Sequence, residues 1–320
     1  MLRSAITTAV ASALLAIGLT TLAAAPASAT PTDTPTASPV PSASVSASPT
    51  PTPTATPTPT PLPPLPQATR LSHYGGHSAG SRTLTLTGTG FAQLSAVLVG
   101  GVEAPGLVVV NDTTARFVMG IAPNYQAAVL AVSLRSLDGR IAPTPIRYAY
   151  KAVNRLDKQM QYAFAHWNLY SSKRFGYITD NDCANFTSQT LLARGWRQSS
   201  AWWNDGSAAK GLPDASSTWI SSTAMSNWLK TRPDLATHLT YTQRDQATVG
   251  DIVQFNWNSK KNPGVWLHTA VVSRIVVLPN GRHDIHYVAH TNNTSDGGGT
   301  QYLADHYSKY LRIQFWHLKQ

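Results

Sequence analysis

The chain has 320 residues, carries a formal charge of +10 and contains a single cysteine. This length allows two domains of ordinary size, and one cysteine excludes an internal disulfide framework. The basic residues are scattered and no nucleic-acid-binding motif is present, so the charge indicates anionic polymers or membrane surfaces as partners rather than nucleic acid.

Residues 1–29 have the pattern of a secretory signal peptide. Arg3 gives the charged start, residues 9–22 the apolar core, and Ala27-Ser28-Ala29 the small-residue cleavage site. A membrane anchor is the alternative, but the run is short for a span and contains several Ser and Thr residues. We expect an exported mature chain with no transmembrane segment, extracellular or associated with the cell wall.

Residues 30–66 consist almost wholly of Pro, Thr, Ser and Ala. Such a composition cannot form an apolar core and favours an extended, polyproline-like spacer. We therefore predict a disordered linker over this stretch.

Residues 67–150 predict an all-β domain. Short apolar strands are separated by turn signals such as Gly100-Gly101 and Asp138-Gly139, a pattern typical of a β-sandwich. The expected strands are Leu84–Thr87, Ala96–Val99, Gly106–Val110, Ala115–Met119, Ala128–Leu134 and Ile146–Tyr150.

This stretch resembles the IPT/TIG group of immunoglobulin-like domains. The resemblance rests on residues 81–91, on Val97-Leu98-Val99-Gly100-Gly101 followed by Ala104, and on Tyr148-Ala149-Tyr150. It implies a spacer or binding module, and the stretch contains no set of acids, bases or ligands that predicts chemistry.

Residues 153–318 have a different pattern, with helices first and strands last. Helical spacing or helix-end signals mark Leu156–Tyr170, the run from Cys183 to Gly195, and Ser222–Lys230. The expected strands are Asp251–Trp257, Thr269–Val277, Asp284–His290 and Tyr310–Leu318. This order predicts an α+β domain with an antiparallel sheet.

Cys183 opens the second of these helices. A helix N-terminus favours a thiolate, and Asp182 suits the N-cap position. His268 lies downstream at the start of an apolar strand, and His290 ends the next strand. A thiol, a base and an orienting polar group are the components of a cysteine acyl-transfer enzyme. The alternative is an inert buried cysteine.

Residues 153–318 also resemble the bacterial putative amidase domain family, which is similar to the papain-like CHAP and NlpC-type cell-wall enzymes. The matching segments are Tyr162-Ala163-Phe164-Ala165, Asp182-Cys183-Ala184-Asn185-Phe186-Thr187-Ser188-Gln189, Gly195-Trp196, Trp202-Trp203, Ser217-Thr218-Trp219, Gly250-Asp251-Ile252-Val253, His268-Thr269-Ala270-Val271-Val272 and Ala289-His290-Thr291.

The resemblance implies an α+β papain-like catalytic domain with an antiparallel sheet, preceded by the immunoglobulin-like sandwich. It also implies that Cys183 is the nucleophile, His268 the general base and His290 the group that orients it. Family sequences usually have Thr after the cysteine where this chain has Ala184, and the Cys-Gly-Ser-Cys-Trp signature of papains is absent.

Acyl transfer also needs donors for the oxyanion. The backbone N–H of Cys183 is the expected first donor, and the side chain of Tyr177 or Asn181 is a candidate second donor. Polar loop residues of this kind are also commonly just solvated.

A metal site is not expected. His283, His286 and His290 lie close in sequence, but strand alternation places the first and last on opposite faces, and no acidic or cysteine partner stands at ligand spacing. We expect no cofactor, a surface or groove-lining role for His286, and a structural role for His166.

Four tryptophans could stack on sugars, although their large apolar area favours a core role. These are Trp202, Trp203, Trp219 and Trp228.

The sequence therefore predicts a secreted, monomeric cysteine amidase or peptidase that hydrolyses amide bonds in peptidoglycan and contacts anionic wall polymers. The alternative is a non-catalytic wall-binding or adhesive protein whose enzyme-like domain is inactive. Nucleic acid is not an expected partner.

Overall fold

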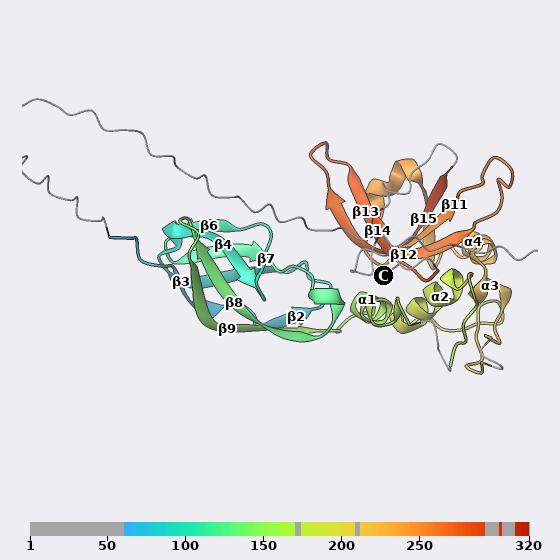
Figure 1. Ribbon diagram of the computed structural model, residues 1–320, viewed down its shortest axis with the longest axis horizontal. Coiled ribbons are helices and arrows are strands. Elements are labelled where there is room, and N and C mark those ends of the chain that lie inside the picture. The colour runs from blue at the N-terminus through green and yellow to red at the C-terminus, as the bar shows by residue number, and fades with distance from the viewer. Residues whose placement is uncertain (1–60, 170–173, 209–211, 292–300, 303–310, 320) are drawn as a thin grey trace, which may run out of the picture. The chain divides into compact units, whose positions relative to one another are not determined.

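The computed structural model describes residues 61–169, 174–208, 212–291, 301–302 and 311–319 (Figure 1). These residues belong to one compact unit, Thr60–Gln320. The signal peptide expected at 1–29 and most of the linker expected at 30–66 lie outside the described residues. Within the described ranges, no helix is long and apolar enough to cross a membrane.

Two sheets form the N-terminal region, with strand orders β1-β3-β7-β6 and β2-β9-β8-β4-β5. The strands are β1 Gln67–Leu71, β2 Gly75–His77, β3 Thr83–Thr89, β4 Leu94–Val99, β5 Val102–Glu103, β6 Val108–Asn111, β7 Thr114–Val118, β8 Ala128–Ser136 and β9 Ile141–Lys151. Two short 3-10 helices, η1 Phe91–Gln93 and η2 Pro123–Tyr125, interrupt them.

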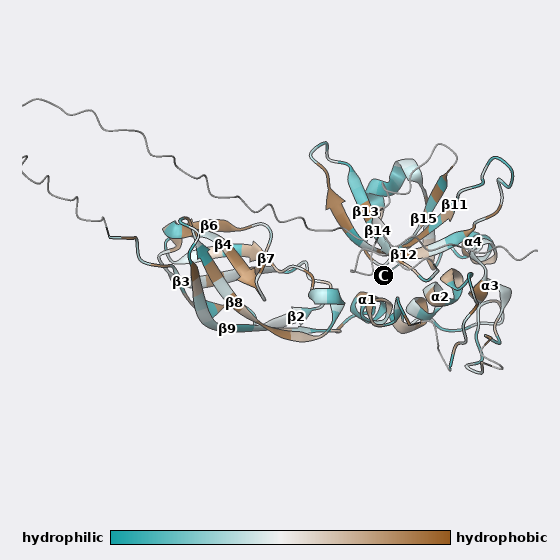
Figure 2. Ribbon diagram, viewed as in Figure 1, coloured by the Kyte–Doolittle hydropathy of each residue, from teal (hydrophilic) through white to brown (hydrophobic). Residues whose placement is uncertain are grey.

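Alternation along the strands builds the core between these two sheets. In β3, Leu84 and Leu86 are buried while Thr83 and Thr89 are exposed, as expected for a strand with one face covered. Figure 2 shows apolar residues along the strands of this region. The apolar cluster joins residues of both sheets, including Phe117 of β7 and Tyr148 of β9.

The C-terminal region begins with helices. They are α1 Arg155–His166, α2 Cys183–Arg194, α3 Ser217–Ile220 and α4 Ser222–Lys230. The Asn154 side chain caps α1 through a capping box with Asp157. Helix α2 ends at Gly195, whose φ of 99° is a left-handed conformation that glycine adopts without strain.

A six-stranded antiparallel sheet follows, in the order β10-β15-β11-β12-β13-β14. Its strands are β10 Ala236–Thr240, β11 Ile252–Asn256, β12 His268–Val277, β13 His283–Val288, β14 Gln301–Tyr302 and β15 Arg312–Leu318. A 3-10 helix, η4 Tyr241–Gln246, follows β10. Strands β12 and β13 form a hairpin whose turn includes Gly281 at a φ of 77°.

The two faces of this sheet carry different apolar clusters. Val271 of β12 and Val288 of β13 pack with Met160 of α1 and Phe186 of α2. The opposite face holds a second cluster, whose members include Val253, Phe255, Ala270, Val272, Tyr287 and Phe315. The helices α1 and α2 therefore cover the face to which Val271 points.

The predicted fold class is wrong in its α+β papain-like catalytic domain, whereas the two N-terminal sheets agree with the all-β sandwich expected before it. Among the described residues, fifteen strands in three sheets stand against four α-helices, so the chain is mostly β-sheet. The helices are short, with 12 residues in each of α1 and α2, 4 in α3 and 9 in α4, so they make up less of the chain than the strands. Short strands such as β2 and β10 depend on pairing with β9 and β15, and their sequences do not alternate.

Candidate active site

Cys183 is the first residue of α2, as the sequence predicts, and its side chain is buried. Gly176, in the loop before it, has a φ of 69°, and a Cβ there would lie 2.4 Å from the backbone nitrogen of Pro213. A glycine is therefore required at position 176, where this loop passes close to the backbone of Pro213.

Asp182 occupies the N-cap position, but its side chain makes no capping hydrogen bond, so the expected capping role is wrong. Its Oδ1 instead accepts hydrogen bonds from the Ile178 N–H at 3.0 Å and from the Asn185 side-chain amide at 2.9 Å. The carboxylate therefore stabilises the loop before α2 through the Ile178 N–H, and it does not cap the helix.

The cysteine sulfur lies among hydrogen-bonding groups. Its Sγ is 3.5 Å from the Ser222 hydroxyl at the start of α4. The backbone N–H groups of Thr269 in β12 and Ala184 in α2 also donate to the sulfur. Three elements, α2, α4 and β12, therefore meet at the thiol.

Burial raises the pKa of the Cys183 thiol above its ordinary value. The hydrogen bonds to the sulfur lower that pKa, but they do not outweigh burial, and the neighbouring Asp182 carboxylate raises it further. The expectation that the helix N-terminus yields a thiolate is thus not met in this conformation. Attack by this sulfur requires a base that removes the proton.

His290 lies on the helix-covered side of the sheet, two residues beyond the end of β13. Its Nδ1 is 2.6 Å from Oδ2 of Asp182, and its Nε2 is 2.7 Å from the carbonyl oxygen of His166. The ring is buried and stacks on Phe186 with centroids 4.1 Å apart. Both nitrogens face acceptors, so the ring is fixed against the start of α2.

His268 is the first residue of β12 and is half-buried. Its ring lies 5.9 Å from the ring of Phe255 and 5.7 Å from that of Trp257. Alternation gives His268 the same side of the strand as Ala270, whose cluster includes Phe255, while Thr269 points toward the helices.

The structure thus brings Cys183 together with Ser222 and the backbone of Thr269, and it joins His290 to Asp182. His268 is the residue before Thr269, but its ring lies near Phe255 and Trp257, on the face of the sheet away from the helices.

The two oxyanion candidates lie in the loop before α2. Tyr177 is half-buried, and Asn181 is exposed, with its backbone N–H donating to the Ile178 carbonyl at 3.1 Å. Their proposed role stays a prediction.

Gln254 of β11 is a positioning residue that the sequence analysis missed. Its side-chain amide donates to the Ser222 carbonyl at 2.8 Å and to the Thr269 hydroxyl at 3.0 Å. Its Oε1 accepts from Gln314 at 2.7 Å and from the Trp316 indole at 3.0 Å. Two glutamines within apolar strands were the available signal, since buried amides need partners.

Burial bears on the roles expected for the tryptophans and for His286. Trp202 and Trp219 are fully buried in one cluster, with their rings 4.6 Å apart, which confirms a core role. His286 is buried, so the surface alternative is wrong, and the groove-lining alternative stays a prediction. Within the described part of the chain, no group of three or more His, Cys, Asp and Glu residues could hold a metal ion.

The chain shows weak likenesses to several solved structures. The chain is 14% identical to the plexin A4 extracellular region (TM-score 0.24), covering 27% of this chain and 8% of that one. It is 18% identical to SGBP-B of a Bacteroides ovatus mixed-linkage glucan utilization locus (TM-score 0.22), covering 28% and 23%. It is 9% identical to an auxiliary nutrient binding protein from Bacteroides ovatus (TM-score 0.21), covering 74% and 46%.

The chain spans less than half the length of each of these proteins, and TM-scores this low carry no argument about fold or function. None of the curated proteins matches the chain.

A family model gives a clear match. The putative amidase domain matches residues 153–316, about half of the chain, and includes the whole of the site described above. This match does not test the resemblance of residues 67–150 to the IPT/TIG group, or the similarity of the family to the CHAP and NlpC-type enzymes, and both stay predictions. The chain belongs to the putative amidase domain family.

Proposed function

We propose that this protein is an exported cysteine amidase or peptidase that uses Cys183 as its nucleophile. The observation that carries the proposal is the position of the chain's single thiol. It stands at the first residue of α2, within the family match, where its sulfur is 3.5 Å from the Ser222 hydroxyl and accepts a hydrogen bond from the Thr269 N–H. Family membership supports amide-bond hydrolysis as the reaction class.

In the proposed mechanism, the Cys183 sulfur attacks the amide carbonyl carbon while an imidazole takes the thiol proton. We assign that role to His268, the residue next to Thr269. The tetrahedral oxyanion then collapses, the C–N bond breaks, and the imidazole gives the proton to the departing amine. Water, deprotonated by the same imidazole, hydrolyses the thioester and restores the thiol.

The raised pKa of the thiol fits a mechanism in which proton removal accompanies attack, rather than one that starts from a stable thiolate. Because the His268 side chain lies against Phe255 and Trp257 here, on the face of the sheet away from the helices, this mechanism requires the start of β12 to rearrange so that the ring reaches the sulfur when substrate binds. We assign His290 to holding the loop before α2 in place through Asp182.

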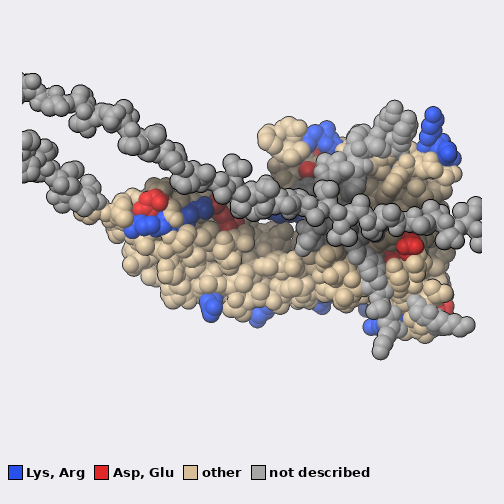
Figure 3. All heavy atoms as spheres, in the orientation of Figure 1, with Lys and Arg blue, Asp and Glu red and all other residues tan. Residues whose placement is uncertain are grey.

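For the substrate we propose peptidoglycan, cut in the stem peptide or at the amide that joins the peptide to the glycan. The export signature and the formal charge of +10 support contact with an anionic wall. On the face drawn in Figure 3, the Lys and Arg side chains lie in several separate places, which suits diffuse attraction rather than a dense nucleic-acid patch.

One observation favours a second candidate, a wall-binding protein without turnover. Cys183 is only 2% exposed, and its pKa is raised. A thiol that remains covered cannot reach a substrate carbonyl.

The test is mass spectrometry of the soluble products released from purified Gram-positive cell walls. Wild-type protein should release fragments whose masses identify the bond that is cut, while Cys183→Ala and the size-matched Cys183→Ser should release none. Fragments from all three proteins would overturn the cysteine mechanism. Wall binding by all three without fragments would support the second candidate.

A further inference from the structure

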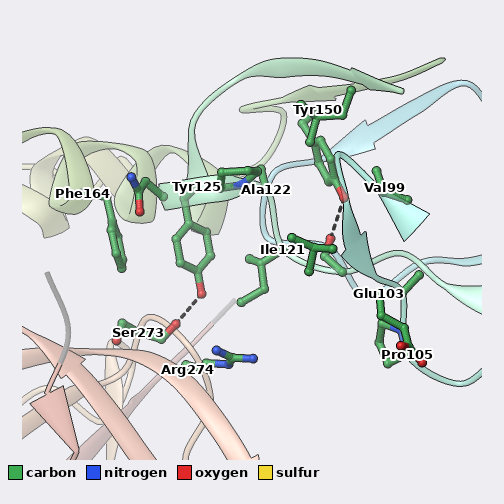
Figure 4. A pocket seen from close by; sticks show the side chains of 16 residues that line it. Val99, Glu103, Pro105, Ile121, Ala122, Tyr125, Tyr150, Phe164, Ser273 and Arg274 are labelled. Carbon is green, nitrogen blue, oxygen red and sulfur yellow. Dashed lines mark hydrogen bonds between the residues drawn. The ribbon is translucent and has the colours of Figure 1, made fainter. Parts of the chain in front are cut away.

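A pocket of about 490 Å³ lies away from Cys183, between the N-terminal sandwich and β12 (Figure 4). Small-molecule pockets are typically roughly 300–1,000 Å³. Its lining comes from the sandwich, from Phe164 of α1, and from Ser273 and Arg274 of β12. No residue of α2 lines it, so it is separate from the candidate active site.

A β-bulge forms one wall of this pocket. The register between β12 and β13 shifts between Val272 and Arg274, which leaves Ser273 as the extra residue. The hydroxyl of Tyr125, from the sandwich, donates a hydrogen bond to the Ser273 carbonyl. Bulges redirect the side chains beside them, and Figure 4 shows the Arg274 side chain below Ile121 and beside the Tyr125 hydroxyl.

The opposite wall has an unusual backbone. Asn124 and Tyr125 have φ values of 49° and 56°, and positive φ is uncommon for residues other than glycine. Such conformations persist only where the surroundings hold them. Here Tyr125 is held by its bond to Ser273 and by its ring, which lies 5.0 Å from that of Phe164.

The pocket combines aliphatic walls with one uncommitted positive charge. Ile121 and Leu130 line it, and Ile121 remains 38% exposed. Glu103 at the rim is paired with Arg135. Arg274 makes no ion pair with any residue in the described part of the chain.

We propose that this pocket binds the C-terminal carboxylate of a short apolar peptide. The Arg274 guanidinium would hold the carboxylate through paired hydrogen bonds, and the aliphatic side chains of the peptide would lie against Ile121 and Leu130. A single cation favours one negative charge, and Glu103 is already paired with Arg135. The proposal is independent of the amidase reaction.

The probes are acetyl-alanyl-alanine and its C-terminal amide, which differ only in the charge that Arg274 would bind. Calorimetric titrations use the full chain carrying Cys183→Ala, so that both ligands stay intact whatever the activity. The acid should bind at least about tenfold more tightly than the amide, because a hydrogen bond to a charged group contributes that much.

Two further variants in the same background locate the site. Arg274→Gln should weaken the acid about tenfold and leave the amide unchanged. The matched control is Arg282→Gln, an exposed arginine on the β12–β13 turn outside the pocket, which should change neither affinity. Ile121→Trp should fill the pocket and abolish binding of both ligands, with thermal melts verifying that each variant is folded.

Three results would overturn the proposal. The first is no binding of the acid to the folded protein. The second is equal binding of acid and amide. The third is an affinity that neither Arg274→Gln nor Ile121→Trp changes.

Discussion

The Cys183 thiol is the residue on which the proposed chemistry depends, and its environment favours the protonated form. The pKa is raised from 9.0 chiefly by burial. Between 9.0 and the higher folded value, the unfolded chain has lost the thiol proton while the folded chain retains it. The folded state therefore loses stability as the pH rises through this window.

This gives a pH-dependent prediction. Between pH 8 and pH 10, the free energy of unfolding of wild type should fall relative to that of Cys183→Ala, as measured by urea denaturation. Comparison with the variant removes the contribution of buried tyrosines such as Tyr162, whose pKa burial raises to about 12. A difference that stays constant over this range would show that the thiol is not shielded from solvent.

Asp182 links the loop before α2 to His290, and both side chains are buried. We expect Asp182→Asn to lower the free energy of unfolding by about 3 kcal/mol, because one amide oxygen cannot replace the two carboxylate oxygens that contact His290, the Ile178 N–H and the Asn185 amide, which leaves buried polar groups unsatisfied. The matched control is Asp180→Asn, two residues earlier and exposed at a φ of 58° that asparagine tolerates, which should change stability by less than about 0.5 kcal/mol.

Chemical denaturation of both variants checks this prediction. Equal stability of Asp182→Asn and Asp180→Asn would show that the His290 contact does not hold the start of α2.

At the scale of elements, Gln254 of β11 connects the start of α4 with β12 on either side of the sulfur. Gln254→Leu keeps a similar volume but leaves the Ser222 carbonyl and the Trp316 indole without this partner. We expect a loss of about 2–4 kcal/mol in stability and a fall in kcat larger than any change in KM. The control is Gln67→Leu in β1, an exposed strand position.

Urea denaturation and wall-hydrolysis kinetics measure the two effects. Unchanged kcat in a folded Gln254→Leu protein would remove this glutamine from the support of the site.

Sequence patterns were informative wherever a local signal decided the outcome. Helix α4 spans the predicted Ser222–Lys230, and α2 ends before Gly195, because capping serines and a C-terminal glycine act within a few residues. Strand β10 was missed because Ala236–Thr240 becomes a strand only by pairing with β15.

The position of Cys183 in the chain's secondary structure was predictable, and the geometry around its thiol was not. The sequence marks Cys183 as a helix start, but burial of its thiol depends on α4 and β12 packing over it. The face of β12 on which His268 lies is set by the register with β11, which pairs His268 with Phe255. A register shift of one residue would move the His268 side chain to the opposite face of the sheet. The local sequence does not determine this register.

At the scale of the whole described unit, Asp157 joins the sandwich to α1. Its buried carboxylate accepts from the Ala79 and Val153 N–H groups, both at 2.9 Å, and lies 3.1 Å from Nδ1 of His77. Burial opposes ionisation of Asp157, but these hydrogen bonds outweigh burial and lower its pKa. The stabilisation is therefore present above the unfolded value of 3.8 and is lost as the pH falls through the folded value.

Asp157→Asn should lower the free energy of unfolding by about 3 kcal/mol at pH 7, and the difference from wild type should shrink toward pH 3. Asp214→Asn, an exposed position, is the control and should have little effect at either pH. A deficit of the same size at both pH values would mean that the charge of Asp157 is not what joins the two regions.

The central claim, that Cys183 is the nucleophile, is tested most directly by trapping the acyl-enzyme. Wild type and Cys183→Ser are mixed with solubilised peptidoglycan fragments, quenched in acid within milliseconds to seconds, and digested for peptide mass spectrometry. We expect a transient thioester adduct on the Cys183 peptide of wild type that disappears as product forms and that the variant does not form. Product formation without any adduct on Cys183, or with equal turnover by Cys183→Ser, would contradict it.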